Sequence, residues 1–288
     1  MKYAIVANPV SGKMKIDQKK KALAEAVEVL GADCVIEGFD TTSRKEFCSC
    51  VSDLSQKVDT IIIAGGDGTV SDAINSLDPD VKAGYLPLGS ACALGQELAL
   101  PRDMRKAAIR IRDGSVHNID LILCENDKKA IMASIGMNAH NIQVRNKLLK
   151  MGIKGGLAYT VGTTTSFFRY KRTDITIDVD GETISLRNVI STIIAKTRSF
   201  GYKMMLIPEA KVDDGHLHVL AVNAGRVSVA YNLLKSFVAP IRVGEYRKTK
   251  NIRITTKDER DLQVDGDIYK KAKEFHFKVL PGAFKLIY

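Results

Sequence analysis

Along its first 125 residues the chain alternates short apolar runs with longer segments whose apolar residues recur every three or four positions. Apolar runs are typical of buried strands, and the wider spacing is typical of amphipathic helices. The pattern predicts strands at 3–7, 34–39, 60–64 and 83–88, and helices at 16–30, 43–55, 70–76 and 104–112. Strand and helix in alternation form a parallel sheet with helices on both faces, so we expect a three-layer α/β domain over residues 1–125.

The second half of the chain has a different pattern. Helical spacing at 138–150 and 157–169 gives way to short, strand-like segments at 175–179, 183–186, 189–196, 216–222, 251–256, 262–264 and 274–279. Asp180 and Gly181, between the first two strands, form a dipeptide typical of tight hairpins. We expect an antiparallel β-rich domain over residues 126–288. Its last residues can pack back on the first domain, and a ligand cleft is expected between the domains.

Charge and cysteine content narrow the class of protein. The formal net charge is +10, which favours anionic partners such as an acidic membrane surface or nucleic acid, although a solvated basic surface explains it equally well. No apolar stretch reaches the length of a membrane-spanning helix. Five cysteines without a C-x-x-C pair predict neither a disulfide framework nor a zinc site, which fits a reducing compartment. We therefore expect a cytoplasmic protein.

A glycine-rich loop, Gly65, Gly66, Asp67, Gly68 and Thr69, directly follows the strand at 60–64 and opens a helix. Glycines let backbone amides approach phosphate oxygens, and a helix N-terminus adds donors and a favourable dipole. Asp67 adds a carboxylate for Mg²⁺ or for an acceptor hydroxyl, and its place among glycines suggests little packing. Thr69 adds a hydroxyl donor. The spacing fits neither a Walker A loop nor a dinucleotide fingerprint. The alternative is a tight turn without a ligand.

Polar residues also follow the first and fourth predicted strands. Because the carboxyl ends of parallel strands meet at one edge of a sheet, these residues are expected near the glycine-rich loop. Ser90 follows the fourth strand and is positioned to donate to a phosphate. Lys13 can meet phosphate charge. The loop after the first strand supplies Asn8, Pro9, Ser11, Gly12 and Lys13.

Together these three loops resemble the catalytic domain of the diacylglycerol kinase-like lipid kinases. The resemblance lies in an Asn-Pro-x-Ser-Gly start at 8–12, the Gly-Gly-Asp-Gly-Thr loop at 65–69 and a Pro-Leu-Gly-Ser loop at 87–90. It continues through segments at 118–121, 155–159, 208–215 and 264–267. The glycine-rich loop is shared with NAD kinases, whereas the first loop and the 208–215 segment favour the lipid kinase branch.

The resemblance implies a reaction and a set of roles. ATP and a diacylglycerol-like lipid hydroxyl would give ADP and a lipid phosphate, with Mg²⁺ as cofactor, in phospholipid biosynthesis. The partners implied are nucleotide and lipid at the anionic inner face of a membrane, and no nucleic acid. Asp265 would accept the proton, with Asp267 beside it. Thr41, Ser90, 8–12 and 66–72 would contact ATP. A structural Mg²⁺ would be held by Asp213, Asp214 and a backbone carbonyl near Leu217.

Two positions depart from the family's pattern. Cys92 and Ala93 stand where the family usually has Asn-Asp, and Asp267 stands where it has Glu. Two alternatives therefore stay open beside the lipid kinase. One is an NAD kinase, whose acceptor is a ribose hydroxyl. The other is a nucleotide- or lipid-binding homologue with weakened catalysis.

Three further patterns have simpler interpretations. The tetrapeptide at 179–182, Val-Asp-Gly-Glu, matches the family's catalytic sequence, but we interpret Asp180 as part of a hairpin turn and place the base at Asp265. His216 and His218 are interpreted as an exposed or core pair rather than as metal ligands. Phe167 and Phe168 precede three cations within 169–172, which fits either a membrane-touching patch or a helix end packed on the core.

Overall fold

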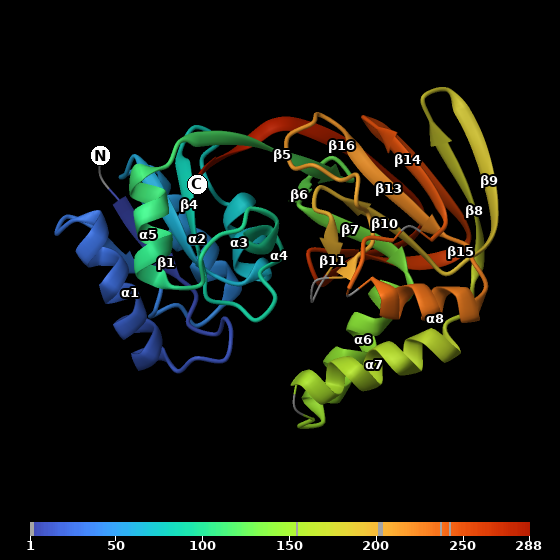
Figure 1. Cartoon of the computed structure of the whole chain (residues 1–288), viewed down its shortest axis with the longest axis horizontal. Helices are drawn as coiled ribbons and strands as arrows, with labels where there is room; N and C mark the ends of the chain where they lie inside the picture. Colours follow the sequence, from blue (N-terminus) through green and yellow to red (C-terminus); the bar gives the residue numbers. More distant parts are fainter. Residues whose placement is uncertain (1–2, 154, 201–203, 237, 242) are drawn as a thin grey trace. The chain divides into compact units, whose positions relative to one another are not determined.

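The computed structural model describes residues 3–153, 155–200, 204–236, 238–241 and 243–288. The chain forms two compact units, whose elements are drawn in Figure 1. Unit 1 contains the chain up to Leu121 together with Pro281–Tyr288, and unit 2 contains Ile122–Phe200 and Met204–Leu280. Two strands, β5 (Val116–Cys124) and β16 (Asp267–Ile287), contribute residues to both units.

Unit 1 is built on a parallel sheet. Its strands follow the order β2-β1-β3-β4, and the end of β16 pairs with β4 at Leu286 and Ala83. Alternate residues of β1 face opposite sides, and both sides are buried, which is why the strand is apolar throughout. The strands are β1 (Tyr3–Ala7), β2 (Val35–Glu37), β3 (Thr60–Gly65) and β4 (Lys82–Pro87).

Helices cover both faces of this sheet. On one face, Leu23 of α1 and Ala107 of α5 pack in one cluster with Ile5 and Ile62 of the strands. Helices α2 and α3 pack on β1 and β3. Ser43 caps α2 by accepting from the Glu46 amide at 3.2 Å. The helices are α1 (Ile16–Leu30), α2 (Arg44–Ser55), α3 (Asp67–Ile74), α4 (Ala93–Glu97) and α5 (Met104–Asp113).

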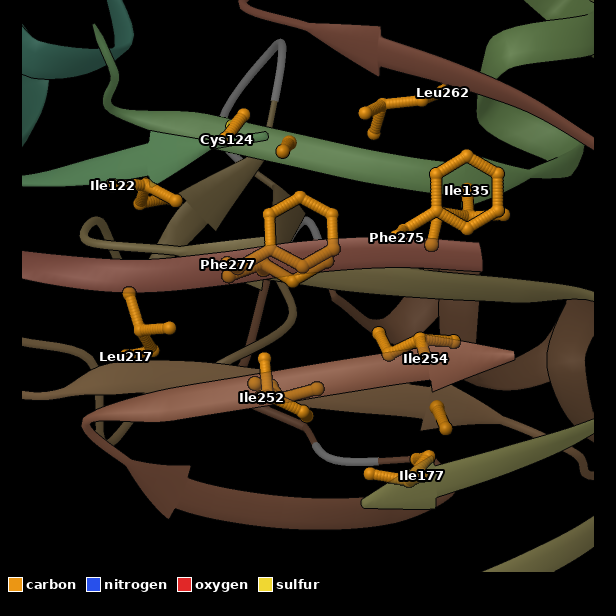
Figure 2. Close-up of a cluster of buried hydrophobic side chains, with 14 of the residues drawn as sticks. Ile122, Cys124, Ile135, Ile177, Leu217, Ile252, Ile254, Leu262, Phe275 and Phe277 are labelled. Atoms are coloured by element: carbon orange, nitrogen blue, oxygen red, sulfur yellow. The ribbon is translucent and has the colours of Figure 1, made fainter. Parts of the chain in front are cut away.

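Unit 2 is an antiparallel β domain with helices. One path of paired strands runs β14-β13-β10-β7-β15-β16, and β8 pairs with both β15 and β9. Figure 2 shows the core of this unit, in which Phe275 and Phe277 lie among Ile135, Ile252 and Ile254. The strands are β6 (Lys128–Ala130), β7 (Met132–Gly136), β8 (Thr173–Val179), β9 (Glu182–Val189), β10 (Ser191–Ala195), β11 (Ser199–Phe200), β12 (Met204–Met205), β13 (Leu217–Val222), β14 (Glu245–Thr249) and β15 (Asn251–Val264).

Among its described residues, unit 2 has three helices: α6 (Met137–Lys150), α7 (Gly155–Arg169) and α8 (Arg226–Lys235). Helices α6 and α7 pack against each other. Within the described residues, no helix is long and apolar enough to cross a membrane.

The predicted fold class is confirmed: a parallel α/β unit precedes an antiparallel β-rich unit. Two strand predictions are wrong in extent. The segments at 251–256 and 262–264 form one strand, β15, whose pairing is irregular between Thr255 and Arg260. The segment at 274–279 is only part of β16, which runs for 21 residues. Strands β6, β7, β11, β12 and β14 and helices α4 and α8 were not predicted.

Candidate functional site

The loop after β1 is held from behind by a buried lysine. The Asn8 amide donates to the Ala64 carbonyl at 3.3 Å, and the Asn8 side chain accepts from the Val10 amide at 3.0 Å. The ammonium of Lys19, on α1, donates to the carbonyls of Asn8 at 3.1 Å and Pro9 at 2.6 Å. Lys19 is only 1% exposed, and burial lowers its pKa. These two carbonyls therefore face the ammonium, which makes the loop more favourable for an anion.

The loops after β1, β3 and β4 approach one another closely at glycines. A Cβ at Gly89 would lie 2.3 Å from the Gly66 Cα, so the two backbones are in direct contact. A Cβ at Gly66 would lie 3.4 Å from the Ser11 hydroxyl, and one at Gly65 would lie 2.4 Å from the Thr69 hydroxyl. The three loops singled out from sequence thus lie together at the carboxyl edge of the parallel sheet, where α/β proteins bind ligands.

Arg102 holds the loop after β4 much as Lys19 holds the first. Its guanidinium donates to the carbonyls of Gly89 at 2.8 Å, Ser90 at 3.2 Å and Ala91 at 3.0 Å. Helix α3 begins beside this loop, and its N-cap, Gly66, has no side chain to cap the first amides. With loop carbonyls held by cations and helix amides lacking a side-chain cap, the loop cluster is suited to phosphate oxygens.

Asp67 has a structural role that the sequence did not predict. Its carboxylate accepts from the Ala93 amide at 2.6 Å, at the start of α4. Burial raises the pKa of Asp67, and hydrogen bonds from the amides of Ala93 and Cys92 oppose that rise. The expectation that this side chain has little packing is wrong, because it anchors α4. Its carboxylate is occupied by amides, which disfavours the predicted contact with Mg²⁺ or with an acceptor hydroxyl.

Cys92 and Thr41 both lie in loops at this edge. Cys92 adopts a left-handed conformation, with φ of 53°, and is 1% exposed. It is thus a small buried residue where the family has a polar one. The Thr41 hydroxyl donates to the Gly38 carbonyl at 2.7 Å, inside the turn after β2. Lys13 is exposed. Asp72, within the predicted ATP segment, is bound by Arg44 at 2.6 Å.

In unit 2, Asp265 occupies the two-residue turn between β15 and β16. Its φ is 46° and that of Gly266 is 94°, values in the left-handed region that tight hairpins require. The carboxylate accepts from the amides of Ile131 at 3.2 Å and Met132 at 2.9 Å, and the residue is half-buried. These bonds fix the direction of the carboxylate. Asp267 opens β16 and is exposed.

Asp180 occupies the same kind of turn, between β8 and β9, with φ of 50° followed by 83° at Gly181. The expectation that a hairpin turn distinguishes Asp180 from Asp265 is therefore wrong, because both residues form one. Their surroundings do differ. Asp180 is exposed, its carboxylate accepts from the Thr249 hydroxyl at 3.0 Å, and it lines an open cavity of about 530 Å³.

The predicted structural magnesium site does not fit the side chains around Asp214. One carboxylate oxygen lies 3.0 Å from the Lys196 ammonium, and the other lies 3.0 Å from the Lys248 ammonium and 3.1 Å from His218. Burial opposes ionisation of Asp214, but hydrogen bonds from Lys196 and Lys248 hold its pKa well below the usual range. Three nitrogen groups therefore occupy the carboxylate that was expected to bind Mg²⁺.

Lys196 binds oxygen atoms of the segment that was expected to hold a metal ion. Its ammonium is fully buried and also donates to the His216 carbonyl at 2.5 Å, so it bridges a carboxylate and a carbonyl oxygen. Asp213 is exposed, and Leu217 pairs with Thr249 in the β13–β14 ladder. Among the residues that the structure describes, no group of three or more His, Cys, Asp or Glu side chains could hold a metal. The side chains around Asp214 thus form an ion-pair network, which does not favour the predicted ligand set.

His218 confirms the simpler of the two interpretations given to the histidines. It is fully buried, and its other ring nitrogen lies 2.9 Å from the Tyr246 hydroxyl. Sequence reasoning missed Lys19, Arg102 and Lys196. Of these, only Lys196 left a signal, as a lysine at the end of an otherwise uncharged strand.

Comparisons with known proteins match both units. A family model described as the diacylglycerol kinase catalytic domain matches residues 2–124. A second, described as the YegS C-terminal NAD kinase beta sandwich-like domain, matches residues 131–288. A diacylglycerol kinase of Staphylococcus haemolyticus is 25% identical over 276 residues, covering 91% of this chain and 81% of the relative. That of Staphylococcus saprophyticus is 25% identical over 293 residues, covering 97% and 90%.

Solved structures share the fold at lower identity. A diacylglycerol kinase structure from Bacillus anthracis superposes with a TM-score of 0.77 at 18% identity, covering all of this chain and 96% of that one. An NAD kinase of Archaeoglobus fulgidus in complex with ATP gives a TM-score of 0.53 at 16% identity, covering 100% and 93%.

Proposed function

Because the chain belongs to the family of diacylglycerol kinase-like lipid kinases, we propose that it transfers the terminal phosphoryl group of ATP to the hydroxyl of a diacylglycerol-like lipid. The observation that carries the proposal is the loop cluster of unit 1, where Gly66 and Gly89 touch and Lys19 and Arg102 hold loop carbonyls. Phosphoryl transfer depends mainly on positioning phosphates and stabilising their charge, and this cluster is suited to both.

On the nucleotide side, we assign the phosphates of ATP to the amides of 8–12 and 66–69. Ser11 and Ser90 add hydroxyl donors, and Lys13 adds an exposed positive charge. Mg²⁺ that arrives with ATP neutralises charge on the phosphate oxygens. The carboxylates of Asp67 and Asp72 are already bound, to an amide and to Arg44. The chain's own contribution at this loop cluster is therefore made by amides, hydroxyls and cations.

On the acceptor side, we assign the general base to Asp265, with Asp267 beside it. Amides of Ile131 and Met132 fix the Asp265 carboxylate, so that it does not have to be ordered when a substrate arrives. A general base must come within about 3 Å of the hydroxyl whose proton it accepts. Asp265 then takes that proton as the hydroxyl oxygen bonds to phosphorus and ADP leaves.

A lipid acceptor implies work at a membrane surface. The net charge of +10 favours an anionic leaflet, and the described helices cannot span a bilayer. We propose peripheral association at the inner face of the membrane, within phospholipid biosynthesis. Screening by salt should weaken this association, because the Debye length is about 10 Å at 0.1 M.

One observation favours a second candidate function. The fold is also that of an NAD kinase solved with ATP, and an NAD kinase would use the same kind of loop cluster with a ribose hydroxyl as acceptor. Cys92 and Ala93, in place of the family's Asn-Asp, favour a third candidate, a homologue with weakened turnover.

The test is a transfer assay with radiolabelled ATP. Diacylglycerols, sphingoid bases and other lipids in mixed micelles are offered separately, and NAD is offered in parallel. Label in a lipid phosphate is the expected result. Label in NADP alone would support the NAD kinase. ATP binding without transfer to any acceptor would support the weakened homologue.

A further inference from the structure

Acidic residues are missing from two long stretches of unit 2. The chain has 33 Asp and Glu residues, yet none lies at 128–173 or at 215–244. All three helices of unit 2, α6, α7 and α8, lie in these stretches. Lysines and arginines are present in both, so the helical part of the unit carries positive charge only. Such a surface attracts anions and has no acidic side chains of its own to neutralise it.

Three large apolar side chains of helix α8 face solvent. Val227 is 85% exposed, Tyr231 64% and Leu234 74%. Their spacing of four and then three residues places them on one face of the helix. Val229, on another side of the helix, is buried. Val238, just after the helix, is 82% exposed as well.

Cations lie at both ends of this helix, and the end of α7 is bound to the segment before it. Arg226 and Lys235 are the first and last residues of α8, and both are exposed. Arg172, just after α7, donates to the Ala224 carbonyl at 2.7 Å, which ties the end of α7 to the start of α8 (Figure 1). In the last turn of α7, Phe168 is 65% exposed beside exposed Arg169. The exposure of Phe168 favours the membrane-touching patch over a helix end packed on the core, the two interpretations that the sequence left open.

We propose that α8 is the membrane-docking element, with Val227, Tyr231 and Leu234 entering the headgroup region of an anionic lipid surface. Arg226 and Lys235 then contact lipid phosphates. This pairing of apolar side chains with cations and no acids is typical of helices that lie in a membrane interface. Helix α8 itself carries two cations and no acidic residue, which argues against a second copy of the chain as the occupant, because two such helices repel each other. The inference rests on the proposed function, since a lipid kinase must reach acceptors held in a bilayer.

The experiment compares wild type, Val227→Asp and Leu234→Asp by co-sedimentation with vesicles. Vesicles of phosphatidylcholine alone are compared with equimolar phosphatidylcholine and phosphatidylglycerol. Wild type should bind the anionic vesicles, and each variant should bind at least about tenfold more weakly, because a charge replaces an inserted side chain. Val116→Asp, at an exposed apolar position of unit 1, is the matched control and should bind like wild type.

Kinase assays with a water-soluble short-chain diacylglycerol separate this inference from the proposed function. The α8 variants should phosphorylate the soluble acceptor as wild type does and lose activity only on vesicles. If the chain binds anionic vesicles through α8 but phosphorylates no acceptor, the proposed kinase activity is refuted and the docking surface is still supported. Undiminished vesicle binding by both variants would overturn the docking surface. So would light scattering that shows a wild-type dimer and monomeric variants, because α8 would then join two copies.

Discussion

Asp265 and Asp180 have nearly the same local backbone structure, but their surroundings differ. Both begin two-residue hairpin turns with positive φ, which Asn also tolerates, so Asp→Asn preserves either turn. In the wild type the Met132 amide lies 2.9 Å from the Asp265 carboxylate. In Asp265→Asn the side-chain carbonyl can still accept from this amide, but as a neutral acceptor. We expect this to cost about 1 kcal/mol, which corresponds to a fall in melting temperature of about 2–4 °C.

The catalytic effects should differ far more than the stabilities. Loss of a general base typically reduces turnover by about 10²–10⁴. We therefore expect Asp265→Asn to reduce lipid phosphorylation by at least about 10², whereas Asp180→Asn should stay within about twofold of wild type. Initial rates with saturating ATP and acceptor, together with thermal denaturation, make the comparison. If Asp180→Asn abolishes turnover and Asp265→Asn is harmless, the base has been assigned to the wrong hairpin.

Three further predictions concern buried charges. Asp67→Ala should lower the melting temperature as well as turnover, because it removes the acceptor for amides at the start of α4; an unchanged melting curve would contradict this role. EDTA should leave the wild-type melting temperature unchanged. Lys196→Met should lower the free energy of unfolding, measured by urea denaturation, by about 3–5 kcal/mol, because Asp214 then loses a buried partner. The depressed pKa of Asp214 stabilises the fold fully above the ordinary Asp pKa of about 4, and this stability should be lost as pH falls below it, but not in Asp214→Asn.

Much of the fold could be predicted because its signals are local. The parallel unit alternates apolar runs with helical spacing, and α1 matches its predicted limits. Strand β7 was missed because its short apolar run, following Ile131, has no alternation of apolar and polar residues. Helix α8 was missed although Val227, Tyr231 and Leu234 have helical spacing. The stretch is short, and these three side chains face solvent instead of a core.

The candidate site also has parts that the sequence predicts and parts that it does not. Glycines make the loop cluster recognisable in the sequence, because closely packed backbones leave no room for a side chain, as at Gly89 beside Gly66. Lys19 and Arg102 hold these loops through backbone carbonyls, and such contacts leave no pattern in the sequence around the lysine or the arginine. Asp214 shows the limit of motif matching. The motif indicated a metal ligand, but distant residues Lys196 and Lys248 determine what the carboxylate binds.

The central claim is that the glycine-lined loops of unit 1 hold ATP for transfer to a lipid. It is tested most directly by measuring ATP binding and label transfer to diacylglycerol in wild type and Gly89→Ala. An added Cβ would lie 2.3 Å from the Gly66 backbone, so the loops must separate. The account predicts that wild type binds ATP and forms labelled lipid phosphate, while a folded Gly89→Ala variant does neither. Wild-type binding and transfer by Gly89→Ala, or a wild type that binds ATP and labels no lipid, would contradict it.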